Sequence, residues 1–388
     1  MVVLSEKFKR FVAPGTQRAV AQLTEGDATC YPLYYFIPSI TADGRYLIYH
    51  RAAQSEIQLY RLDLTTAEST RLTHAQAPAT HWIPWCVDSG RGVLDHRSVL
   101  NVARGEVVYF DDQQARVVDV QTLDDRVLFT LPQDRIAIGQ NCVTPDGRWF
   151  VYIHHDKAGF ERVYPLEGRG QRYQSKGTAL AAYNLDTGEH RPLVILNSPI
   201  HHVLPYDDNH VVFCHPTMEN GMLLTDLQGG WYTHLRTQDE QGGCVCHYVA
   251  TQRGIAYEVL GRADGVRSGL YDPLTHAHVE FPLPHYFGYT HTGRDPEGRL
   301  WFYENEDWLT RVHDMHVLLR HNPAGDDVWL RLIADWPTYG GGQKAHFHPQ
   351  VVLDRQWLLF TGGDATTQTN HLFLLDIADL PDTQGITL

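Results

Sequence analysis

VTPDGRWFVY, residues 143–152, combines the end of an apolar strand, a polar Asp-Gly turn and a second strand of aromatic and β-branched residues. The pattern returns as ITADGRYLIY (40–49), CVDSGRGVLD (86–95), LPYDDNHVVF (204–213), VATQRGIAYE (249–258), RDPEGRLWFY (294–303) and VVLDRQWLLF (351–360). The turn residue of each copy serves as its marker: Gly44, Gly90, Gly147, Asn209, Gly254, Gly298 and Arg355. Seven units of about 50 residues predict an all-β, seven-bladed β-propeller with four strands per blade.

The two ends of the chain predict how the ring closes. The last unit reaches only its third strand before Leu388, whereas AVAQLT near the start is similar to ESTRLT, the end of a blade. We therefore expect the N-terminal strand to complete the seventh blade, which leaves no free sheet edge. Residues 1–388 are expected to form a single propeller domain.

Composition limits the partners. The chain of 388 residues has 46 acidic and 32 basic residues and a net charge of −14, which disfavours binding to nucleic acid or to an anionic membrane. No apolar run of signal-peptide or membrane-span type is present, so a cytoplasmic protein is expected. The six cysteines are scattered and predict no disulfide framework. The sequence carries no signal for an oligomeric state.

The chain has 23 histidines, and several fall in register with the turns. Seven positions before the markers stand Ile37, Ile83, Gln140, His202, His247, His291 and His348. Four consecutive blades thus place histidine at one inward-facing position of the strand next to the channel, and His346 shares the face of His348. Packed, hydrogen-bonded core histidines are the alternative explanation.

The spacing Gln343-x-x-His346-x-His348, together with His291 from the neighbouring blade, predicts a metal site. Three imidazole nitrogens and an amide oxygen suit manganese, iron, nickel or zinc. No ligand in this set is charged, so the cation would remain strongly electrophilic toward a substrate carboxylate. Beside it, His247 is a candidate general base and His202 a candidate substrate contact, whereas His215 is expected near the rim of the channel.

Other patterns are less specific. The acidic run at 304–307 fits a solvated loop better than a calcium site, and GGGQ at 340–343 fits a flexible approach to Gln343. Residues 157–176 break the pattern of the third blade and carry Arg162, Arg169 and Arg172. This basic segment is either a functional loop or a solvated excursion. No G-x-S-x-G motif is present.

The chain resembles the oligogalacturonate lyases, which are cytoplasmic seven-bladed propellers of pectin breakdown. Gln343-Lys-Ala-His346-Phe-His348-Pro349 is similar to the Q-x-x-H-x-H-P metal segment of that family, and Thr290-His291 to its S-H segment. Cys246-His247 resembles its C-T-H segment, in which the histidine is the proposed base. The resemblance implies a manganese ion and β-elimination from a uronic acid.

Two positions depart from the family. Tyr31-Pro32 follows Thr29-Cys30 where the family has His-Arg, and Gly221 replaces an arginine ahead of Met222-Leu223-Leu224. Two polar or cationic sugar contacts are therefore missing where the resemblance places them. Arg162, Arg169 and Arg172 are the candidates to replace the missing arginine.

The resulting hypothesis is a lyase that acts on a small oligosaccharide containing a uronic acid. His247 would remove the C5 proton, the C4–O bond would break, and a 4,5-unsaturated sugar would result. Three alternatives remain open. They are a metal-dependent lyase or isomerase acting on another sugar derivative, a non-enzymatic propeller that binds protein, and a hydrolase with paired carboxylates, for which no pair stands at the channel positions.

Overall fold

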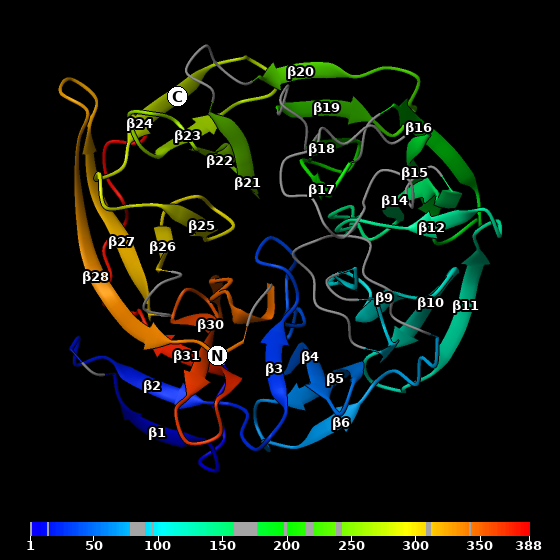
Figure 1. Ribbon diagram of the computed structural model, residues 1–388, viewed down its shortest axis with the longest axis horizontal. Helices are drawn as coiled ribbons and strands as arrows, with labels where there is room; N and C mark the ends of the chain where they lie inside the picture. The colour runs from blue at the N-terminus through cyan, green and yellow to red at the C-terminus, as the bar shows by residue number, and fades with distance from the viewer. Residues whose placement is uncertain are drawn as a thin grey trace.

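Seven β-sheets form a closed ring around a common centre, where the sequence predicts the channel (Figure 1). The computed structural model describes residues 2–13, 15–77, 90–94, 97–158, 177–197, 200–214, 221–237, 243–307, 312–340 and 343–388. Every strand in these ranges belongs to one of the seven sheets. The predicted all-β, seven-bladed propeller is therefore confirmed.

Each of the first three blades is made from successive strands. Blade 1 contains β3 (Thr29–Pro32), β4 (Tyr46–Ala53), β5 (Glu56–Asp63), β6 (Ser69–Arg71) and β7 (Arg91–Gly92). Blade 2 contains β8 (Val99–Asn101), β9 (Glu106–Asp111), β10 (Gln114–Asp119) and β11 (Asp125–Thr130). Blade 3 contains β12 (Arg135–Ala137), β13 (Cys142–Val143), β14 (Trp149–Asp156), β15 (Thr178–Asn184) and β16 (His190–Leu196).

The next three blades have four strands each. Blade 4 contains β17 (His202–Pro205), β18 (His210–Cys214), β19 (Met222–Asp226) and β20 (Thr233–Arg236). Blade 5 contains β21 (Cys244–Thr251), β22 (Gly254–Leu260), β23 (Arg267–Tyr271) and β24 (His278–Pro282). Blade 6 contains β25 (Tyr289–Arg294), β26 (Trp301–Asp307), β27 (Val312–Asn322) and β28 (Asp327–Pro337). In Figure 1 the first strands β17, β21 and β25 lie nearest to the centre of the ring.

Blade 7 joins the two ends of the chain. It runs β29 (Gln350–Val352), β30 (Trp357–Asp364), β31 (Thr369–Asp376), β2 (Ala19–Gln22) and β1 (Lys9–Val12). The register pairs Val20 with Leu375 and Gln22 with Phe373, so the N-terminal strand closes the last blade as predicted. β1 adds a fifth strand outside β2, which the sequence pattern did not indicate.

The predicted turn after the first strand is present in blades 1, 3 and 6, whose marker is a glycine with positive φ. Gly44, Gly147 and Gly298 have φ of 72°, 74° and 69°, a conformation that glycine adopts without steric cost. In blade 2 the predicted marker Gly90 is wrong, because the turn between β8 and β9 lies at residues 102–105. Gly90 instead precedes β7, which pairs in parallel with β5 of blade 1.

The misassignment has a steric reason. A side chain at Gly92 would place its Cβ 1.9 Å from the carbonyl oxygen of Ile57, so the glycines of this segment serve close strand approach rather than the repeated turn. The turn marker of blade 2 is therefore Gly105. Seven positions before it stands Ser98, which is buried and takes the channel position assigned to Ile83.

Ring closure makes a stability prediction. Val20 is 1% exposed and packs among Phe360, Phe373 and other apolar residues of blade 7, whereas Val12 on β1 is 53% exposed. We expect Val20→Asp to destabilise the fold by about 3 kcal/mol or more, since it buries an unpaired charge. Val12→Asp is the matched control and should change the thermal midpoint little. Equal midpoints for the two variants would contradict the closure.

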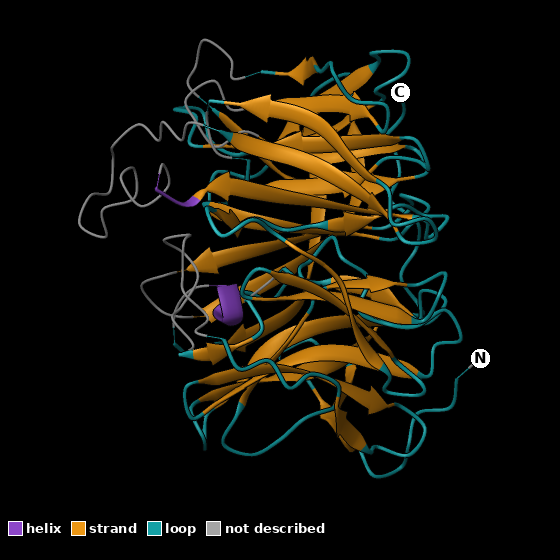
Figure 2. Ribbon diagram, turned by 90° about the vertical axis from the view of Figure 1, so that its right-hand side faces the viewer, coloured by secondary structure: helices purple, strands orange, loops and turns teal. Residues whose placement is uncertain are grey.

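The two faces of the ring differ. Figure 2 shows the short 3₁₀ helix η1 (Gln343–Ala345) at one face, and the N-terminus at the other. Val2 lies against the turn at Gly44, so the turns after the first strands belong to the N-terminal face. Positions several residues before these turns therefore lie toward the η1 face. No helix among the described residues has the length and apolar character needed to cross a membrane.

Candidate metal centre

Three histidines predicted as metal ligands come together in the channel. The ring centroids of His291 and His346 lie 4.7 Å apart, those of His291 and His348 5.1 Å, and those of His346 and His348 5.5 Å. All three residues are at most 3% exposed. Gln343 begins η1 directly before this segment, but its side chain lies outside the described part of the structure.

Backbone geometry supports a functional reading of two channel histidines. His348, just before β29, has φ of 47°, and His247, within β21, has φ of 53°. The left-handed region is unfavourable for a residue with a side chain, and such strain concentrates at functional sites. This observation favours a site over ordinary core packing.

His247 stands beside the three histidines. Its ring stacks on that of His291, with centroids 4.2 Å apart and an interplanar angle of 29°. The register of β21 against β22 shifts between Cys246 and Val249, and this bulge changes the direction in which the His247 side chain points. The structure therefore places the predicted base next to the predicted ligands.

Two buried glutamates complete the cluster. Glu304 and Glu306 lie two residues apart on β26, hence on the same face of the strand, and are 0% and 5% exposed. Ligand atoms of His291, Glu304, Glu306 and His346 all lie within 4.8 Å of one another. The prediction that residues 304–307 form a solvated loop is wrong for both glutamates, which are buried on a strand. The site also contains two carboxylates, although the predicted ligand set has no charged member.

The carboxylates hold the imidazoles by hydrogen bonds. The Nδ1–H of His291 donates to Glu306 Oε1 at 3.0 Å, and the same atom lies 3.5 Å from Glu304 Oε2. Burial disfavours a charged ring, but the bonds to Glu304 and Glu306 outweigh it and raise the pKa of His291 to about 9. Burial also opposes ionisation of Glu304, yet hydrogen bonds from His291 and His313 lower its pKa.

The donor set fits a divalent cation. Imidazole nitrogen and carboxylate oxygen together suit first-row metals such as manganese. Glu306 Oε2 is buried and has no hydrogen-bond partner among the described residues, and Glu304 Oε2 has none there beyond the 3.5 Å approach of His291 Nδ1. Buried charge of this kind is costly unless a cation or a proton compensates for it.

An aromatic segment between β3 and β4 contacts the histidines. Tyr34 lies with its ring centroid 5.4 Å from His202 and 4.9 Å from His348. Tyr35 lies 5.4 Å from His291. The sequence pattern did not predict this segment, because it counted blade 1 as an ordinary copy of the repeat.

His202 lies against Tyr34, which also contacts His348. Its Nε2 forms a hydrogen bond with the Tyr34 hydroxyl at 3.1 Å, and the two rings stack. Desolvation lowers the pKa of His202 to about 3, so its ring is neutral at physiological pH. His202 thus contacts the same aromatic segment as His348. The remaining predicted substrate contacts, His215, Arg162, Arg169 and Arg172, lie outside the described residues.

Gly221, where the resemblance leads one to expect an arginine, lies close to a neighbouring segment of backbone. A Cβ at this position would lie 2.6 Å from the carbonyl oxygen of Arg236 and 3.2 Å from the Cα of Thr237. Both atoms belong to the backbone and cannot turn away. The local chain path therefore leaves no room for any side chain here.

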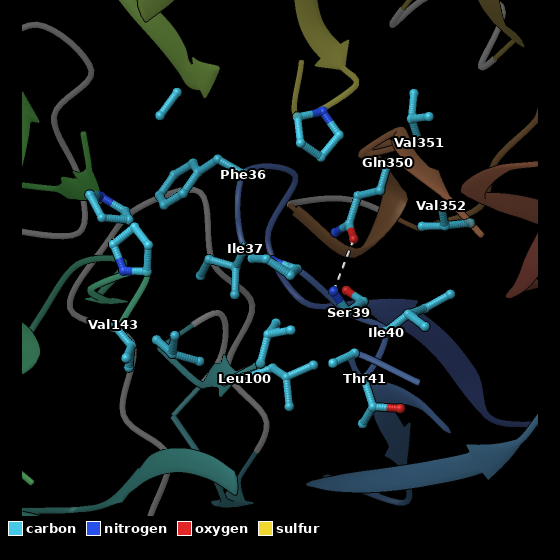
Figure 3. Close-up of a pocket in the computed structure, with 18 of the residues that line it drawn as sticks. Phe36, Ile37, Ser39, Ile40, Thr41, Leu100, Val143, Gln350, Val351 and Val352 are labelled. Carbon is cyan, nitrogen blue, oxygen red and sulfur yellow. Dashed lines mark hydrogen bonds between the residues drawn. The ribbon is translucent and has the colours of Figure 1, made fainter. Parts of the chain in front are cut away.

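A cavity of about 710 Å³ lies in the channel, toward the turns after the first strands. Its wall includes Leu100, Val143 and Val351, as Figure 3 shows. Gln350 closes one side, where its Oε1 accepts a hydrogen bond from the Ser39 amide at 3.2 Å. Tyr35 lines this cavity and also contacts His291, so the aromatic segment lies between the apolar cavity and the histidines.

Comparison with known proteins identifies the family. The profile of the oligogalacturonate lyase family matches residues 3–258. The oligogalacturonate lyase of Dickeya dadantii (strain 3937) is 25% identical over 215 residues, which is 55% of this chain and 52% of that protein. The oligogalacturonide lyase of Pectobacterium atrosepticum is 25% identical over 207 residues, 52% of this chain and 49% of that protein. The chain thus spans about half the length of the curated relatives it matches.

Solved structures extend the likeness in fold to the whole chain. An oligogalacturonate lyase in complex with manganese superimposes with a TM-score of 0.77 at 21% identity, covering 97% of both chains. The oligogalacturonate lyase from Vibrio parahaemolyticus gives a TM-score of 0.76 at 19% identity, covering 97% of this chain and 98% of the other. The family expected from the sequence is confirmed: the chain belongs to the oligogalacturonate lyase family, on a match that covers residues 3–258.

Proposed function

We propose that this protein is a metal-dependent lyase that cleaves oligogalacturonate-type oligosaccharides by β-elimination. The observation that carries the proposal is the stacking of His247 on His291, within a cluster of three buried histidines. The names of the curated relatives and the family profile support the same reaction. The expected cytoplasmic location stays a prediction.

The proposed cofactor is manganese or another divalent transition metal. His291, His346 and His348 would hold it, with Gln343 as the fourth ligand predicted from the sequence. A cation at this position would supply Lewis-acid stabilisation of the negative charge that develops on the uronate. The manganese complex of a structurally similar oligogalacturonate lyase supports this choice.

The side chains of this chain would then divide the reaction between them. His247 takes the proton from C5, a role that requires a neutral imidazole. The electrons of that C–H bond form the C4=C5 double bond, and the C4–O bond breaks. The departing oxygen accepts a proton, which water can supply. His202 and Tyr34 offer a neutral, hydrogen-bonded surface that would orient the sugar.

Further substrate contacts remain proposals from the sequence. His215, Arg162, Arg169 and Arg172 would bind additional carboxylates or hydroxyls, since arginine pairs well with uronates. The proposed partner is a small oligosaccharide, and neither nucleic acid nor membrane is expected.

A second candidate function has an observation of its own. The close backbone approach at Gly221 leaves no room for the arginine that the resemblance places at this position. With two carboxylates near the histidines and no arginine at position 221, a less anionic sugar derivative, such as a keto-sugar glycoside, is the alternative substrate of a lyase or isomerase.

A substrate panel tests the proposed function. Manganese-loaded protein should produce the ultraviolet absorbance of a conjugated, unsaturated uronate from trigalacturonate. A neutral oligosaccharide of equal length should give none. Conversion of a keto-sugar glycoside with no reaction on trigalacturonate would favour the second candidate. Inertness toward all substrates, with the metal bound, would favour a binding module.

A further inference from the structure

We propose that Glu306 is a positioning residue of the metal centre, whose single carboxylate orients the rings of both His291 and His346. The inference rests on the proposed metal site. It assigns a role to a side chain that lies outside the predicted ligand set.

Glu306 is the common hydrogen-bond acceptor of the two imidazoles. Its Oε1 accepts from His291 Nδ1 at 3.0 Å and also from His346 Nδ1. His291 lies on β25 of blade 6, whereas His346 follows η1 on the way to blade 7. One carboxylate therefore links two ligand-bearing segments that are far apart in the sequence.

Glu304 secures the same segment by a different route. Its Oε1 accepts the backbone N–H of Phe347, which stands between His346 and His348, at 2.7 Å. The same oxygen lies 3.0 Å from His313 Nδ1. Thr338 completes this arrangement through its hydroxyl, 2.9 Å from His313 Nε2. Glu304 thus holds the backbone of the predicted metal segment, and Glu306 holds its ring.

This arrangement determines which nitrogen faces a cation. An Nδ1 that donates to a carboxylate fixes the tautomer and the orientation of the ring, so a metal would bind through the opposite atom, Nε2. The carboxylate also raises the basicity of the imidazole and places compensating negative charge behind it. Glu306 would therefore raise metal affinity without touching the ion.

The test compares manganese binding to the full chain without substrate. We expect Glu306→Gln to weaken Mn²⁺ binding by about 10–100-fold, the usual effect of removing an outer-shell carboxylate. Excess Mn²⁺ should restore the bound ion, because the ligands themselves remain. Glu306→Asp keeps the charge but withdraws it by one methylene, so its Mn²⁺ affinity should lie between those of the wild type and Glu306→Gln. Isothermal titration and the electron paramagnetic resonance spectrum of Mn²⁺ provide the readout.

Glu258→Gln is the matched control. Glu258 is likewise a buried glutamate on the second strand of a blade, but it hydrogen-bonds Ser268 and lies 3.7 Å from Arg294, and its interaction with His291 is a weaker electrostatic one. This variant should bind Mn²⁺ like the wild type. Circular dichroism of each variant checks the fold. A crystal structure of the manganese-loaded wild type tests independently whether Glu306 contacts the ion.

Two results would overturn the inference. One is wild-type Mn²⁺ affinity in folded Glu306→Gln, and the other is an anomalous peak for manganese bonded directly to the Glu306 carboxylate. A wild-type protein that binds no Mn²⁺ would refute the metal centre together with this role. A protein that binds Mn²⁺ through Glu306-oriented histidines but cleaves no uronate would refute only the proposed substrate.

Discussion

His247→Ala is expected to lower turnover on an oligogalacturonate by about 10²–10⁴-fold, the usual scale for loss of a general base. Bound manganese should remain near the wild-type level, because the ring of His247 stacks on His291 rather than belonging to the predicted ligand set. Steady-state rates and metal content measured on the same preparation provide the check.

A second substitution controls for backbone strain at this position. Residue 247 has φ of 53°, a conformation that asparagine tolerates better than alanine does. His247→Asn should therefore reproduce the kinetic loss with the least disturbance of β21. Unchanged turnover in both variants would exclude the base role. Loss of metal together with activity would make His247 a fifth ligand, and His202 would become the next candidate base.

His348→Ala should remove most of the manganese and nearly all of the activity. Loss of a direct ligand is expected to exceed the roughly 10–100-fold effect of an outer-shell residue. The fold should persist, since the blades are held by their own strand pairing and apolar packing rather than by one channel side chain. Metal analysis after dialysis, with circular dichroism, measures both quantities.

His321→Ala is the control for removing a buried imidazole. His321 is 2% exposed and stacks on Phe281 with centroids 4.4 Å apart, in a packing position between blades 5 and 6. This variant should keep its manganese whatever it loses in stability. Retention of the ion by His348→Ala would contradict the ligand role.

The repeat made most of the fold predictable. Acidic turns with glycine recur because each blade needs the same reversal after its first strand, and this local chemistry is visible in sequence. Gly90 misled the pattern because a glycine required for close packing against Ser55 has the same sequence neighbours as a turn glycine. Only the pairing of β7 with β5 distinguishes the two cases.

The part of the site that lies at the same position of successive repeats was predictable from the sequence. His291 and His348 share one position of the repeat, so a correct turn alignment was enough to bring them together. Glu304 and Glu306 were also predictable as strand residues, because they follow the aromatic strand residues 301–303 and continue their alternation around Asn305. Their acidic character instead suggested a solvated loop. The crossing of Tyr34 and Tyr35 into the channel departs from the repeat, and no periodicity could reveal it.

The mass balance of the reaction tests the central claim most directly. Trigalacturonate would be incubated with manganese-loaded and with chelator-treated protein, and the products weighed by mass spectrometry. Elimination predicts products whose masses sum to that of the substrate, formed only when the metal is present and restored when Mn²⁺ is returned. Products that together gain one water, or equal yields without metal, would contradict a metal-dependent lyase.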